Sequence, residues 1–168
     1  MAGNLTHEFE LYTPETFKIL LEHEVNKSRR YRNPLTLIHL SIEAEPNEPT
    51  TQHSAEVFAI NALNLQLRQT DIPCKRDDEF IILIPSTDEQ GGRIVCQRLE
   101  SMFNVQPQTH DRVSFKMAIF IGMASSPGDS SLSGNQLRQQ ASTAMQHARA
   151  NRLSTAVLFS EILELLGI

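Results

Sequence analysis

The sequence predicts an α+β domain in which helices cover a mixed five-stranded sheet. Helical and strand patterns alternate along most of the 168 residues, and one pair of strands, within residues 72–85, follows directly as a hairpin. Hydrophobic residues make up 40% and charged residues 21%, which is the range of globular domains. We therefore expect one domain over residues 11–160, with a lead at 1–10 and a short tail at 161–168.

The first helix and strand have clear boundary signals. Thr13 is the expected N-cap of a helix with Pro14 at its first position, and Asn33 and Pro34 end that helix. Residues 35–42 show little alternation between apolar and polar side chains, which predicts a strand buried on both faces.

The next segment is expected to be irregular. Residues 43–52 form an acidic stretch interrupted by Pro46 and Pro49, which predicts a mobile loop without core residues. A second helix is predicted over residues 53–69. The hairpin follows, and its second strand is the apolar run from Phe80 to Pro85.

The second half repeats the alternation. A helix is predicted after Asp88, a strand over residues 113–124, a further helix from about Leu137 to Ala148, a strand over 155–159 and an apolar tail over 162–166. Gly122 lies inside a strand, where a missing side chain permits close packing of backbones.

Composition excludes several functional classes. The net charge of -5 argues against nucleic-acid binding and against binding to anionic membranes, and no apolar run is long enough for membrane insertion. Cys74 and Cys96 have no metal or disulfide spacing, which favours reduced thiols and a cytoplasmic location. The six histidines also lack metal spacing, so we expect no bound metal and no cofactor.

Five segments together resemble the GGDEF domains of bacterial cyclic di-GMP signalling. They are Arg-Arg-Tyr-Arg-Asn-Pro-Leu at 29–35, Arg-Gln-Thr-Asp at 68–71, Asp-Glu-Phe-Ile-Ile-Leu-Ile-Pro at 78–85, Met-Ala-Ile-Phe-Ile-Gly-Met-Ala at 117–124 and Ala-Ser-Thr-Ala-Met-Gln-His-Ala-Arg at 141–149. The resemblance implies a mostly antiparallel sheet flanked by helices, related to nucleotide cyclases and polymerase palms.

The resemblance also implies that catalysis has been lost. Active members condense two GTP molecules with a magnesium pair held by an aspartate on the first strand and an acid in the hairpin. Here Ser41 takes the aspartate position, whereas Glu43 and Asp78 remain as acids. Arg76 and Asp77 replace the two hairpin glycines, and Arg149 keeps the cation of the family's helix lysine. We interpret the chain as a degenerate GGDEF domain and Asp77, Asp78 and Glu79 as a solvated polar hairpin.

The RxxD motif is a second candidate site. In many family members this motif binds the product, helped by an arginine on the following helix; the matching residues here are Arg68, Asp71 and Arg98. A guanidinium suits guanine O6 and N7, and a carboxylate suits the guanine N–H groups. The alternative is that Arg68 and Asp71 form an ion pair on a helix surface and that Arg98 is solvated.

Three hypotheses follow. The leading one is a non-catalytic receptor for cyclic di-GMP, acting in a homodimer or on a separate signalling protein. The alternative is a nucleotide-independent dimerisation or protein-interaction scaffold, whose sign would be an exposed apolar patch at the tail together with a closed RxxD pocket. An active diguanylate cyclase, in which Glu43 and Asp78 hold magnesium, is the least favoured.

Overall fold

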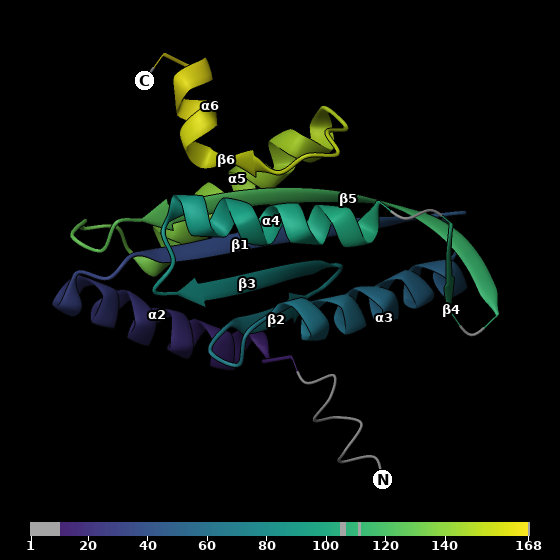
Figure 1. Ribbon diagram of the computed structural model, residues 1–168, viewed down its shortest axis with the longest axis horizontal. Coiled ribbons are helices and arrows are strands. Elements are labelled where there is room, and N and C mark those ends of the chain that lie inside the picture. The colour runs from purple at the N-terminus through teal and green to yellow at the C-terminus, as the bar shows by residue number, and fades with distance from the viewer. Residues whose placement is uncertain (1–10, 105–106, 111, 168) are drawn as a thin grey trace, which may run out of the picture.

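A six-stranded sheet forms the centre of the fold (Figure 1). The structure is a computed structural model that describes residues 11–104, 107–110 and 112–167; the expected lead at 1–10 lies outside these residues. The strand order is β2-β3-β1-β5-β4, and β6 also pairs with β5. All pairs are antiparallel except β5 with β6. The predicted fold class is confirmed, and the additional strand is the short β4 (Gln108–His110).

Strand β1 (Leu35–Glu45) lies between β3 (Glu79–Pro85) and β5 (Val113–Ser126). Its first eight residues are all buried, as the lack of alternation predicted. The predicted loop over residues 43–52 is wrong at both ends, because β1 continues to Glu45 and helix α3 (Pro49–Gln66) begins with Pro49 in its first turn. Proline suits that position since its missing N–H has no helical partner there.

Four long helices cover the two faces of the sheet. Helix α2 (Pro14–Tyr31) starts as predicted, with Thr13 as its N-cap, and packs with α5 (Gly134–Ala150) on one face. Helices α3 and α4 (Glu89–Phe103) pack on the other face, and Figure 1 shows α4 in front of the sheet with its axis running roughly along the strands. Even-numbered residues of β1 face α3 and α4, whereas Leu35 and Leu37 face α2 and α5.

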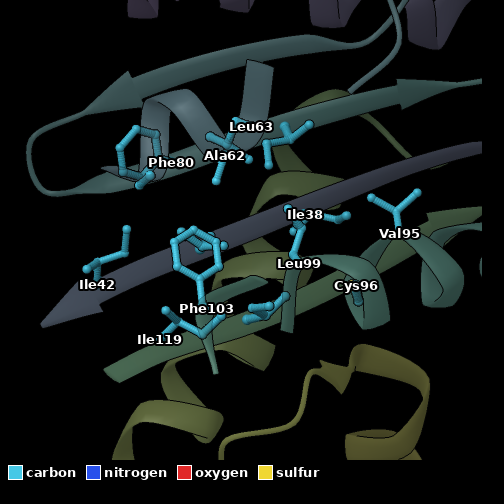
Figure 2. Close-up of a cluster of buried hydrophobic side chains, with 14 of the residues drawn as sticks. Ile38, Ile42, Ala62, Leu63, Phe80, Val95, Cys96, Leu99, Phe103 and Ile119 are labelled. Carbon is cyan, nitrogen blue, oxygen red and sulfur yellow. The ribbon is translucent and has the colours of Figure 1, made fainter. Parts of the chain in front are cut away.

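The larger core cluster lies between the sheet and the α3 and α4 helices. Figure 2 shows side chains of α3, α4, β1 and β3 meeting there, among them Leu63, Leu99, Ile38 and Phe80, each 0% exposed. Phe58 meets Phe103 edge to face, with ring centroids 5.7 Å apart. Leu63, in the last turn of α3, belongs to this cluster, and the RxxD segment follows in the turn after α3.

The carboxyl-terminal part differs from the prediction. The expected strand over 155–159 shortens to β6 (Val157–Leu158), and α6 (Phe159–Leu165) follows without a break. Ile162 is buried, whereas Leu165 and Leu166 are 74% and 67% exposed. Within the described residues, no helix combines the length and apolar character that crossing a bilayer requires.

Gly122 permits the close approach of β5 and α5. A Cβ atom built at Gly122 would lie 2.0 Å from the Met145 backbone nitrogen and 2.4 Å from the Ala141 carbonyl oxygen. Backbone atoms of a helix cannot move aside singly, so any side chain here would push α5 off the sheet.

Gly122→Ala is expected to lower the free energy of unfolding by about 3 kcal/mol or more, because overpacking against backbone has no local relief. Urea denaturation measures the loss. Gly91→Ala is the control: its Cβ meets only side-chain atoms of Thr87 and Asp88, and alanine favours a helix. Equal losses for both variants would contradict this account of Gly122.

Candidate functional site

The β2–β3 hairpin places three acidic residues in different surroundings. Strand β2 (Ile72–Arg76) and β3 are joined by Asp77 and Asp78, both exposed. Asp77 adopts a φ of 56°, the left-handed conformation that aspartate tolerates better than most residues, and its carbonyl accepts a 2.6 Å hydrogen bond from Lys75 Nζ. Asp77 and Asp78 are therefore exposed at the hairpin turn, whereas Glu79 is partly buried.

Glu79 belongs to a polar cluster beneath α5, which we call the Arg149 cluster: His39, Ser41, Glu79 and Arg149. Ser41 lies opposite Glu79 in the β1–β3 register. Arg149 Nη2 donates a hydrogen bond to Ser41 Oγ and lies 3.3 Å from Glu79 Oε1. His39 Nδ1 lies 3.6 Å from Glu79 Oε2. One guanidinium thus contacts both Ser41 of β1 and Glu79 at the start of β3.

The surroundings of Glu79 favour its charged form. His39 lowers the pKa of Glu79 most, Arg149 lowers it further, and partial burial opposes both. The carboxylate is therefore flanked by the Arg149 guanidinium and the His39 ring of the same chain.

The other two acids of interest, Glu43 and Asp78, lie outside the Arg149 cluster. Glu43 Oε2 lies 2.6 Å from Arg152 Nη1, and the Arg152 guanidinium lies over the Phe120 ring, 4.7 Å from its centroid. Asp78 and Glu43 line one hollow of about 400 Å³ at the end of β1. Among the residues with described positions, no group of three or more His, Cys, Asp or Glu side chains is placed to hold a metal ion.

The Gln52 side chain forms hydrogen bonds with the backbone near the end of β1. Its side-chain oxygen accepts a 3.1 Å hydrogen bond from the Ala44 N–H, and its nitrogen donates to the Ile42 carbonyl at 3.3 Å. The N–H that faces the hollow at this strand end is thus already satisfied within the chain. This contact could not be predicted, because the segment was expected to be a loop.

Arg68 and Asp71 lie in the turn between α3 and β2. The predicted helix over 53–69 ends instead at Gln66, so a pair on a helix surface is not the arrangement found. Asp71 Oδ2 accepts a 2.8 Å hydrogen bond from the Arg68 N–H, and the Asp71 N–H donates to the Arg68 carbonyl at 3.0 Å. These reciprocal bonds hold the turn, while the Arg68 guanidinium donates to Thr87 Oγ1 at 3.2 Å.

Asp71 has an unused acceptor. The residue is 7% exposed, and its Oδ1 has no hydrogen-bond partner. Burial raises the pKa of Asp71, whereas the Arg68 backbone bond and the charges of Arg68 and Arg98 lower it. A buried carboxylate oxygen without a donor is energetically costly, so a ligand that supplies a donor gains free energy here.

A cavity of about 430 Å³ adjoins this turn. It is lined by Tyr12, Asn64, Leu67, Arg68, Gln69, Asp71 and Pro73. Arg98 is exposed on α4 and its charge acts on Asp71, but it does not line this cavity. Tyr12 was missed by sequence reasoning, because nothing in the sequence brings a residue before the first helix next to the end of the second.

Comparison with known proteins gives one matching family model. Residues 57–154 match the family model described as "Diguanylate cyclase, GGDEF domain". No curated protein matches the chain.

Several solved structures share this fold at low sequence identity. The GGDEF domain of PA1120 (YfiN or TpbB) from Pseudomonas aeruginosa is 18% identical with a TM-score of 0.77, over 89% of this chain and 97% of that one. The active GGEEF domain of a diguanylate cyclase from Vibrio cholerae is 13% identical with a TM-score of 0.74, over 89% and 98%. The DgcB GGDEF domain from Caulobacter crescentus, solved in complex with c-di-GMP, is 12% identical with a TM-score of 0.71, over 89% and 92%.

Since the family model spans more than half of the 168 residues, this chain belongs to the GGDEF domain family of diguanylate cyclases.

Proposed function

We propose that this chain is a non-catalytic GGDEF domain that acts in the cytoplasm as a cyclic di-GMP receptor, with Arg68, Asp71 and Arg98 as the binding residues. The observation that carries the proposal is the buried, unpartnered Oδ1 of Asp71 beside an exposed Arg68 and an open cavity. The N1 and N2 hydrogens of guanine are the donors that a carboxylate accepts, and guanidinium groups bind guanine O6 and N7 or phosphate.

The magnesium pair of active members does not fit the residues at the end of β1. Magnesium needs several oxygen ligands in nearly octahedral geometry. Ser41 and Glu79 are engaged by Arg149, and Glu43 is engaged by Arg152. Asp78 alone of these acids has no cation partner among the described residues. This donor set supports a role without GTP condensation, although the family includes working cyclases such as the Vibrio cholerae domain.

The scaffold alternative predicts an exposed apolar patch and a closed RxxD pocket, and only the first is found among the described residues. Leu165 and Leu166 are exposed at the end of α6, as an interaction patch would require. The RxxD pocket, however, is not closed by its own side chains, because Arg68 is exposed and Asp71 retains a free acceptor. The open pocket favours the receptor, which acts through a homodimer or a separate signalling protein in this proposal. One neighbour of the same fold, SiaD from Pseudomonas aeruginosa, was solved with its activator SiaC.

Calorimetry with cyclic di-GMP is expected to show binding that Arg68→Ala weakens roughly 10-fold or more, because a charge-assisted hydrogen bond contributes about 1.5–3 kcal/mol. Arg30→Ala is the matched control, since Arg30 is exposed near the opposite end of α2 from Tyr12. No heat at high micromolar dinucleotide, or equal binding by Arg68→Ala, would refute the receptor.

Incubation with GTP and magnesium or manganese is expected to yield no cyclic di-GMP, because Glu43 and Glu79 are bound by arginines and Asp78 alone cannot hold a metal pair. Chromatography of the nucleotides measures the product, and Asp78→Ala should give the same baseline. Turnover that Asp78→Ala abolishes would instead establish an active cyclase.

Glu79→Gln is expected to lower the free energy of unfolding at pH 7 by about 1–2 kcal/mol, since Arg149 and His39 lose their anion. The folded state lowers the pKa of Glu79, so its contribution is present above the ordinary value of 4.5 and is lost as the pH falls through the folded value. Urea denaturation from pH 7 to 3 should therefore show a smaller loss on acidification in the variant. An unchanged slope would contradict a structural role for this carboxylate.

A further inference from the structure

Tyr12 shares the cavity of the RxxD turn and is held there by the backbone. The Tyr12 N–H donates to the Pro73 carbonyl at 3.0 Å, and Tyr12 forms a parallel bridge with Cys74 of β2. Thr13, the next residue, caps α2. The main chain on both sides of the tyrosine is thus anchored, and the cavity lining brings the start of α2, the end of α3 and β2 to one edge of the fold (Figure 1).

The Tyr12 side chain is 41% exposed although its backbone is fixed. Leu67 and Pro73 add apolar surface to the same cavity, while Arg68 and Asp71 add the charged groups. An aromatic face, apolar walls and a carboxylate acceptor within one cavity match a flat, nitrogen-rich ring that carries N–H donors on its edge. A purine of the guanine type has this chemistry, and its ring stacks on aromatic side chains.

We propose that Tyr12 is a ligand-contact residue that stacks on a guanine base whose edge is bound by Asp71. This inference rests on the proposed cyclic di-GMP receptor function and extends it to a residue outside the RxxD motif. The competing role is structural, with Tyr12 only covering the edge strand β2. The two roles differ in what the aromatic ring contributes to binding as opposed to folding.

Affinity measurements separate these roles. Tyr12→Ala is expected to weaken cyclic di-GMP binding roughly fivefold or more, and Tyr12→Phe to retain it, because stacking needs the ring and not the hydroxyl group. Tyr31→Ala is the control, as Tyr31 is 62% exposed at the far end of α2. Urea denaturation of each variant identifies any loss that comes from unfolding.

Intrinsic fluorescence gives a readout that a structural role would not produce. The chain has two tyrosines and no tryptophan, so Tyr31→Phe leaves Tyr12 as the sole fluorophore and Tyr12→Phe leaves Tyr31. Stacked guanine should quench the emission of the first variant in a saturable way and leave that of the second unchanged after absorbance correction.

The outcomes distinguish the two proposals. Binding that Arg68→Ala weakens but Tyr12→Ala does not, with no quenching of Tyr12, would overturn the stacking role and leave the receptor intact. Absence of cyclic di-GMP binding by the unaltered chain would overturn both.

Discussion

The burial of β1 on both faces is the constraint on which the rest of the structure depends. Because β1 pairs along its length with β5 and over seven residues with β3, its register fixes which residues meet at the end of the sheet. Ser41 is placed opposite Glu79, and the odd-numbered face of the strand turns toward α5. The close contact at Gly122 sets the distance of α5 from this face. The register of β1 and the distance of α5 from the sheet together bring Arg149 to the end of β1.

The two candidate sites lie apart, one under α5 at the end of β1 and one beside the edge strand β2, and they leave different polar atoms unpaired. Around Arg149 the Ser41 and Glu79 side chains contact one guanidinium nitrogen, while both ring nitrogens of His39 and Arg149 Nε have no hydrogen-bond partner. Around Asp71 the backbone bonds are complete while one carboxylate oxygen remains unpaired. In the proposed receptor, little conformational entropy would be lost when a ligand supplies the missing donor, because the turn is already held by its own hydrogen bonds.

Sequence reasoning recovered the architecture where local signals were strong. Thr13 and Pro14 marked the first helix, and the apolar run after Glu79 marked β3. It failed where tertiary contacts override local propensity. The prolines at 46 and 49 indicated a loop, yet pairing with β5 extends β1 to Glu45 and Pro49 starts α3. The candidate residues were visible as motifs, but their partners were not, because Arg149 with Ser41 and Arg68 with Thr87 are contacts between segments far apart in sequence.

The arrangement around Arg149 also determines what an acidic side chain at position 41 would contact. An aspartate placed at position 41 would meet the same guanidinium that now donates to Ser41 and would form an ion pair with it. Removing Arg149 first would leave Glu79 without that cation. A cation site at this strand end would therefore require an acid at position 41 and the removal of Arg149 together.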